Sequence, residues 1–192
     1  MKPILFNTEM VQAILDGCKT TTRRVVKPQP PAACIYNRCG NLSWPFWLDG
    51  DKHMLLKPPY HYGDDLYVRE TWAYHDGAID GIIYKANCPK RLAEWKKWNP
   101  SIHMPKEAAR LFLRVTGVHV ERLQDITAAE CAREGIPRES LTEIVEAFTI
   151  GQFSDLWDST VKKADRPIYG WDANPWVWAI KFERISKEEQ PQ

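Results

Sequence analysis

Lys19 and Thr22 lie three residues apart in the stretch DGCKTTTRR, residues 16–24, and their types could support nucleophilic catalysis. A threonine hydroxyl is a poor nucleophile until a base takes its proton, and a neutral lysine amine can be that base. A lysine is neutral near pH 7 when it is buried or close to other cations, and Arg23 and Arg24 would be such cations. The stretch therefore predicts a nucleophile and its base, with an exposed strand of threonine and lysine as the alternative.

The pair works only if both side chains lie on the same side of the backbone. Residues three apart point to opposite faces of a strand, but they come together in a turn that follows a helix. The stretch NTEMVQAILDG predicts such a helix, capped by Asn7 or Thr8 and ended by Gly17. Its apolar stripe consists of Met10, Val11, Ile14 and Leu15. We therefore expect Lys19 and Thr22 to converge.

Expulsion of an amine also requires an acid, and two glutamates are candidates. Thr127 and Glu130 form a capping box at the start of a predicted helix that ends at Gly135. Glu134 then falls in the last turn, where the helix dipole disfavours an anion, which suits an acid. Glu70 is predicted on the apolar face of a strand, where a carboxylate needs a partner. A salt bridge from Glu70 to an arginine is the structural alternative.

Other elements must position these groups. Strands are predicted for four stretches: GDDLYVRETWAY (63–74), its hairpin partner IDGIIYKA (79–86), RLFLRVTGVHVERL (110–123) and PWVWAIKFERI (175–185). In the first, one face is expected to carry Leu66, Val68, Glu70, Trp72 and Tyr74. In the last, one face is expected to carry Trp176, Trp178, Ile180 and Phe182. The pattern of the third shifts at Gly117, which predicts a β-bulge.

A second capping box, Ser140 with Glu143, predicts a further helix. Its apolar stripe is expected to be Leu141, Ile144, Val145 and Phe148. Several strands, a bulge and few helices favour an α+β fold built on a compact β-barrel.

Composition limits the classes of function. The chain has 192 residues, 44% hydrophobic and 27% charged, as in a globular protein of one domain. No stretch is long and apolar enough to be a membrane span or a secretory signal, so we expect a cytoplasmic protein without a membrane partner. The net charge of +1 disfavours a protein that holds a long duplex, so any nucleic-acid contact must be local or the partner small.

The five cysteines suggest reduced thiols rather than a disulfide framework. A metal site built from Cys34, Cys39, His53 and His61 is conceivable, but the spacing is loose and no second clean pair follows it. No glycine-rich phosphate loop or nucleotide fingerprint is visible. We therefore expect neither a metal nor a cofactor.

The chain resembles the ASCH-domain family, a group of PUA-like small β-barrels associated with RNA metabolism. GCKTTTRR is similar to the family signature G-x-K-x-x-[TE]-x-R, and GDDLYVRETW, VERLQDITAAECAREG and WVWAIKFERI resemble later family segments in the same order. MKPILFNTEMVQAILDG and PSIHMP are similar to phage-type members. The resemblance implies a single ASCH-like domain over 1–192, a barrel with flanking helices and insertions at about 27–60 and 76–106.

Within that family, the chain resembles the bacterial N4-acetylcytidine amidohydrolases. The resemblance assigns Thr22 as nucleophile, Lys19 as base and Glu134 as the acid that protonates or orients the cytosine amine. The implied substrate is a small nucleoside acylated on the exocyclic amine of cytosine. Arg24, with backbone amides of the turn, would stabilise the oxyanion.

The base would stack on an aromatic wall, for which Trp72 and Trp47 are candidates. Glu70 has no counterpart in the short enzymes and is kept as a substrate-binding candidate. Two other functions stay open: an ASCH module that binds RNA or a modified nucleotide without chemistry, and a ribonuclease using His103 and Lys106. The oligomeric state cannot be read from the sequence.

Overall fold

The computed structural model describes residues 1–30, 46–49, 52–75, 81–89, 97–136 and 143–186. At 46–49, 52–55 and 143–145 it describes the backbone alone.

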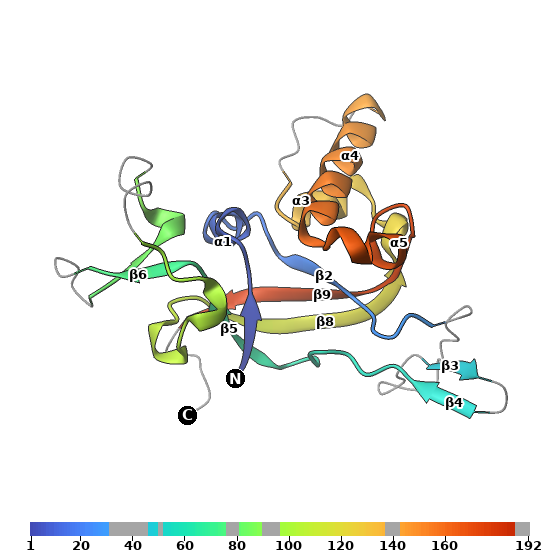
Figure 1. The fold of residues 1–192 in the computed structure, drawn as a ribbon, viewed down its shortest axis with the longest axis horizontal. Helices are drawn as coiled ribbons and strands as arrows, with labels where there is room; N and C mark the ends of the chain where they lie inside the picture. The colour runs from blue at the N-terminus through green and yellow to red at the C-terminus, as the bar shows by residue number, and fades with distance from the viewer. Residues whose placement is uncertain (31–45, 50–51, 76–80, 90–96, 137–142, 187–192) are drawn as a thin grey trace.

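The chain is an α+β protein with a mostly antiparallel sheet (Figure 1). The five strands of that sheet, in spatial order, are β1 (Lys2–Leu5), β5 (Asp65–Arg69), β8 (Phe112–Arg122), β9 (Trp176–Ile185) and β2 (Thr21–Val25). Only the pair β1–β5 is parallel.

Helix α1 (Thr8–Leu15) connects the two edge strands, β1 and β2. The Asn7 side chain caps it by accepting a hydrogen bond from the Met10 amide at 2.8 Å, and Gly17 follows it with φ of +75°. Val11 and Ile14 are buried against the sheet. The helix predicted from the sequence is therefore confirmed, together with its cap and its stop.

Strands β8 and β9 form a long antiparallel pair through the middle of the molecule (Figure 1). Their register shifts between Val115 and Gly117, so the predicted bulge is confirmed. The face of β9 that carries Trp176, Trp178, Ile180 and Phe182 is buried, as predicted.

A group of helices is inserted between β8 and β9 and lies on the same side of the sheet as α1 (Figure 1). It consists of η4 (Leu123–Asp125), α3 (Ala128–Arg133), α4 (Glu143–Thr160), η5 (Lys163–Asp165) and α5 (Arg166–Tyr169). The predicted capping box of α3 is present in both directions between Thr127 and Glu130. Strand β2 runs beneath the space between α1 and this group.

The α4 stripe predicted from the sequence is wrong at Phe148, which is 64% exposed. The buried positions of the helix are instead Thr149, Phe153 and Trp157, which recur every four residues. Ser140 and Leu141 lie outside the described residues, and so do the side chains of Ile144 and Val145.

The strand predicted over 63–74 is two strands, because β5 ends at Arg69 and β6 (Trp72–Tyr74) begins three residues later. The Glu70 amide, which follows β5, donates to Met104 Sδ at 3.1 Å rather than to a neighbouring strand. Trp72 packs in a cluster separate from Val68, and Tyr74 is exposed, so the single predicted apolar face is wrong.

Smaller elements complete the described chain. Strand β6 pairs with β7 (Ile82–Tyr84), which confirms the predicted hairpin, and β3 (Phe46–Asp49) pairs with β4 (Lys52–Leu55). Three single turns of 3₁₀ helix are η1 (Lys85–Asn87), η2 (Ser101–His103) and η3 (Lys106–Ala108). Within the described residues the sheets are open, with β1 and β2 at the edges of the largest, and no closed barrel is present.

Candidate functional site

Lys19 lies in the short loop between α1 and β2, at the point where three elements meet. Its amide donates to Ala13 of α1 at 3.0 Å, and the Thr20 amide donates to Arg133 at the end of α3 at 2.8 Å. The Lys19 side chain has no exposed surface. Its Nζ donates to the Thr21 carbonyl at 2.9 Å, to the Glu134 carbonyl at 2.8 Å and to Glu134 Oε2 at 2.6 Å. An ammonium has three N–H donors, and these bonds use all of them.

Glu134 is the C-cap residue of α3, and its side chain turns inward against Lys19. The next residue, Gly135, has φ of +95°, and a Cβ on it would lie 2.8 Å from Ala13 Cβ. Glycine is therefore required both by the backbone conformation and by the close approach of α1. This tight turn holds the Glu134 carboxylate over the loop that carries Lys19.

The second carboxylate oxygen of Glu134 accepts a hydrogen bond from Arg23 Nη1 at 3.1 Å. Arg23 Nε also donates to Glu121 Oε1 at 2.7 Å, and the guanidinium lies 3.4 Å from Glu130 Oε2. Glu121 in turn bonds His119 Nε2 at 2.8 Å. A continuous polar chain thus connects the half-exposed His119 to the buried Lys19.

Burial lowers the pKa of Lys19 below its ordinary value. The charge and hydrogen bond of Glu134 oppose this effect, while the positive charges of Arg24 and Arg23 lower the pKa further. The Lys19 amine therefore loses its proton more readily than an exposed lysine. Glu134 Oε2, at 2.6 Å, is the nearest acceptor to Lys19 Nζ.

Thr22 is 1% exposed and pairs with Ile180 of β9, so it sits within the sheet rather than on a free turn. Strand geometry puts Thr22 and Arg24 on one side of β2 and Arg23 on the other. Within the described chain, the three acceptors of Lys19 Nζ do not include the Thr22 hydroxyl. The structure thus brings Lys19 and Glu134 into contact, whereas Thr22 lies in strand β2 and not in the turn in which it was expected to meet Lys19.

Arg24 reaches from β2 to the opposite edge strand. Its Nη2 donates to the Leu5 carbonyl of β1 at 2.8 Å, and its guanidinium lies 5.5 Å from the centre of the Phe6 ring. Lys19 Nζ lies 5.6 Å from the same ring. Phe6 is therefore an aromatic side chain that lies beside the predicted site.

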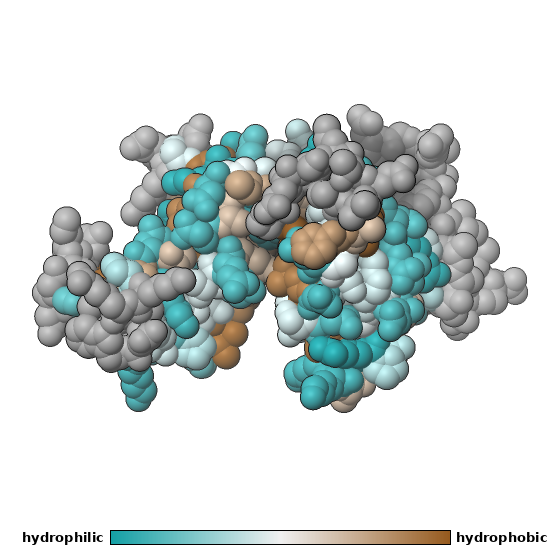
Figure 2. Space-filling view, turned by 90° about the horizontal axis from the view of Figure 1, so that it is seen from above, coloured by the Kyte–Doolittle hydropathy of each residue, from teal (hydrophilic) through white to brown (hydrophobic). Residues whose placement is uncertain are grey.

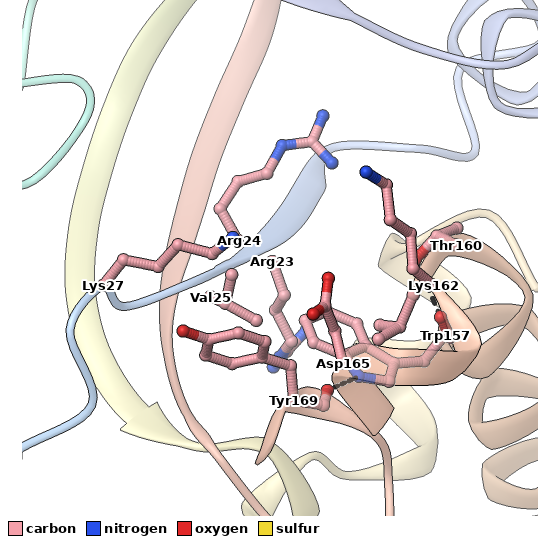
Figure 3. Close-up of a pocket in the computed structure, with 10 residues that line it drawn as sticks. Arg23, Arg24, Val25, Lys27, Trp157, Thr160, Lys162, Asp165 and Tyr169 are labelled. Carbon is pink, nitrogen blue, oxygen red and sulfur yellow. Dashed lines mark hydrogen bonds between the residues drawn. The ribbon is translucent and has the colours of Figure 1, made fainter. Parts of the chain in front are cut away.

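Two cavities flank the Lys19–Glu134 pair. Glu134, with Met10 and Ala13 of α1 and Leu156 of α4, lines one of about 370 Å³. Arg23 and Arg24 line another of about 300 Å³, which lies between β2 and the end of α4 with the turns that follow it (Figure 3). Seen from above, the surface is hollowed between the part that carries α1 and the part that carries the α3–α5 group (Figure 2).

The structure does not bring the remaining predicted residues to this pair. Glu70 is 1% exposed, and both of its oxygens bind Arg110, at 2.8 and 2.9 Å, which is the salt bridge that the sequence allowed as an alternative. Trp72 packs in a buried cluster with Met104 and Phe112. The side chain of Trp47 lies outside the described residues.

His103 and Lys106, the candidates for the ribonuclease alternative, are both exposed, in η2 and η3. Cys34 and Cys39 lie outside the described residues, and His61 lies 3.6 Å from Asp64. Where side chains are described, no group of three or more His, Cys, Asp or Glu residues is arranged to hold a metal ion.

Sequence reasoning treated Arg23 only as a nearby charge and missed Glu121 and His119. Glu121 and His119 share one parity of β8, and that repeat of ionisable residues two apart was the available signal. It did not reveal their partner, because Arg23 is 98 residues away from Glu121 along the chain.

Fold and site together define an α+β protein with a buried lysine–glutamate pair between an edge strand and the end of a helix. Comparison of the chain with family models, with curated proteins and with solved structures finds no match. Among the described residues, no helix combines the length and the apolar character needed to cross a membrane.

Proposed function

We propose that the protein is an ASCH-type amidohydrolase that removes the acyl group from N4-acylated cytosine nucleosides. The observation that carries the proposal is the buried contact of 2.6 Å between Lys19 Nζ and Glu134 Oε2, at a lysine that also donates to the carbonyl of Thr21, the residue before Thr22. Lys19, Glu134 and Thr22 are the three residues that the family resemblance assigns to the reaction. Lys19 and Glu134 are 115 positions apart, and their contact brings the proposed base and the proposed acid together.

The pair supplies both the base and the acid of the proposed reaction. When a proton moves from Lys19 Nζ to Glu134 Oε2, the ion pair becomes a neutral amine and a carboxylic acid. The amine takes the Thr22 proton while the Thr22 oxygen bonds to the acyl carbon. The C–N bond then breaks, and Glu134 gives its proton to the departing cytosine amine.

The second half of the reaction releases the acyl group from Thr22. Water adds to the ester carbon, and the Lys19–Glu134 pair takes the proton of the water. The bond to the Thr22 oxygen then breaks, and the pair returns a proton to that oxygen. The products are a carboxylic acid and a cytosine nucleoside, and the pair is left in its starting state. Arg24 and backbone amides stabilise the oxyanion in both halves.

We also propose that the fold is the PUA-like barrel of that family. Arg24 Nη2 donates to Leu5 O, so a side chain already bridges the two edge strands, β2 and β1. The bulge at Gly117 adds the bend that a small barrel needs. A solved structure in which the β2 and β1 backbones diverge would contradict this part of the proposal.

A second candidate, nucleotide binding without hydrolysis, is favoured by the burial of Thr22 and Lys19. A substrate reaches these groups only after the walls of the flanking cavities move apart. The test that separates the two candidates is an ultraviolet assay of N4-acetylcytidine with wild type, Glu134→Gln and, as a matched control, Glu107→Gln on the exposed η3 turn. Conversion to cytidine by wild type and control but not by Glu134→Gln supports the enzyme. An inactive wild type that still binds N4-acetylcytidine supports the binding module.

A further inference from the structure

The cavity of about 300 Å³ shown in Figure 3 lies between the end of β2 and the segment that follows α4. Its walls are Arg23, Arg24, Val25 and Lys27 on one side and Trp157, Thr160, Val161, Lys162, Asp165 and Tyr169 on the other. Ligand pockets start at about this volume, so it suits one small group rather than a length of polymer. The cavity adjoins the proposed site, because Arg24 is two positions from Thr22 on the same face of β2.

Three cations at this cavity have no carboxylate partner among the described residues: Arg24, Lys27 and Lys162. Arg23, in contrast, is neutralised by Glu121 and Glu134. In Figure 3 the Arg24 guanidinium and the Lys162 amine point toward each other across the mouth of the cavity. One carboxylate, Asp165, also lines it, so the wall keeps an excess of positive charge.

The rest of the wall is aromatic and fixed by hydrogen bonding. Trp157 Nε1 donates to the Tyr169 carbonyl at 2.8 Å, which joins the end of α4 to α5. The Lys27 amine lies 4.8 Å from the centre of the Tyr169 ring. This contact holds one cation over the cavity before any ligand arrives.

We propose that this cavity binds the phosphate group of a phosphorylated nucleoside, so that the substrate of the neighbouring site is a mononucleotide. The identity of the nucleoside rests on the proposed function, whereas the phosphate site rests on the cavity alone. Several cations without a carboxylate partner, gathered around one cavity, are the kind of side chains that bind a phosphate group. The net charge of +1 and the small volume favour one phosphate group over a polynucleotide backbone.

The test measures binding without turnover, by calorimetry with cytidine 5′-monophosphate, cytidine and inorganic phosphate. Wild type is compared with the double variant Lys27→Gln/Lys162→Gln. The control is Lys163→Gln, which removes an exposed lysine adjacent to Lys162 that does not line the cavity. We expect wild type to bind the monophosphate at least about tenfold more tightly than cytidine, since charge-assisted hydrogen bonds carry that difference. The double variant should lose this preference, the control should keep it, and inorganic phosphate should compete with the monophosphate.

Equal affinity of wild type for cytidine and its monophosphate would overturn the inference, and so would an unchanged preference in the double variant. A single-stranded oligonucleotide that binds far more tightly than the monophosphate, through the same lysines, would replace the mononucleotide by a polymer. Failure of the proposed function and failure of this inference give different results. A protein that hydrolyses no N4-acylcytidine can still show the lysine-dependent preference for the monophosphate.

Discussion

Lys19 Nζ lies 2.6 Å from Glu134 Oε2, and neither side chain is more than 4% exposed. The contact joins the loop after α1 to the C-cap residue of α3, and Arg23 binds the other oxygen of the carboxylate. The ammonium of Lys19, the guanidinium of Arg23 and the carboxylate of Glu134 are thus buried together. A substitution of one of these residues therefore changes the electrostatic environment of the other two.

The first prediction concerns the stability of this pair. Removing one partner of a buried ion pair leaves an uncompensated charge and costs about 3–5 kcal/mol. We expect Lys19→Met and Glu134→Gln each to lower the free energy of unfolding by an amount of that order. The double variant should lose clearly less than the sum, because both buried groups are then uncharged. Urea unfolding of the four proteins measures the coupling, and additive losses would show that the pair does not act as a unit.

The second prediction concerns Thr22. Thr22→Val keeps the shape of the side chain but removes the hydroxyl, so turnover of N4-acetylcytidine should fall by about 1000-fold or more, as for other nucleophiles. Thr22→Ser keeps the hydroxyl and should keep measurable turnover. Because valine suits a strand, the melting temperature of Thr22→Val should stay close to that of wild type. Equal turnover by the valine and serine variants would remove Thr22 from the reaction.

The third prediction is a pH dependence. Burial, together with the charges of Arg24 and Arg23, lowers the pKa of Lys19, so the neutral amine forms below the pH at which an exposed lysine loses its proton. Loss of this proton leaves Glu134 with none to give to the departing amine, so kcat/KM should fall as the pH rises, and the falling limb should lie below 10.5, the ordinary lysine value. Arg24→Gln removes a positive charge that favours the neutral amine, so the limb should move to higher pH.

Lys163→Gln is the control for this shift, since it removes an exposed positive charge that does not act on Lys19. If the dependence of kcat/KM on pH is the same in Arg24→Gln as in wild type, or shifts equally in Lys163→Gln, then Lys19 is not the group that titrates. A general loss of activity without a shift would assign Arg24 to transition-state binding alone.

The fourth prediction separates Glu70 from the reaction. Glu70 is buried and bound by both arms of Arg110, whose guanidinium also lies 4.0 Å from the centre of the Tyr84 ring. Glu70→Gln weakens this interaction and should lower the free energy of unfolding by about 1–3 kcal/mol. Turnover per folded molecule should stay at the wild-type level. A loss of kcat in a stably folded Glu70→Gln protein would restore Glu70 as a substrate-binding residue.

The fifth prediction tests the turn that positions Glu134. Gly135→Ala forces a side chain into a left-handed conformation and toward Ala13 Cβ at 2.8 Å, so it should cost about 1–3 kcal/mol and reduce activity. Gly151→Ala, in α4 with nothing within 4 Å, is the matched control. Alanine is the better helix former, so the control should gain about 0.5–1 kcal/mol. Thermal unfolding of both variants measures the contrast, and a stable, active Gly135→Ala protein would show that the turn is not required.

The sequence by itself determined the features that depend on neighbouring residues. The Asn7 cap, the Thr127–Glu130 capping box and the bulge at Gly117 all form within a few positions of the residues that specify them. The apolar face of β9 was readable for the same reason, because Trp176, Trp178, Ile180 and Phe182 alternate along the strand and are all buried.

Only the tertiary structure decided which distant groups meet. Lys19 and Glu134 are 115 positions apart, and Arg23 and Glu121 are 98 apart. Neither contact leaves a periodic pattern in the sequence, and both depend on how α1, β2 and α3 pack together. The exposure of Phe148 and the break between β5 and β6 were missed for the same reason. A local pattern shows that a side chain is apolar, but the packing of the whole chain determines which surface covers it.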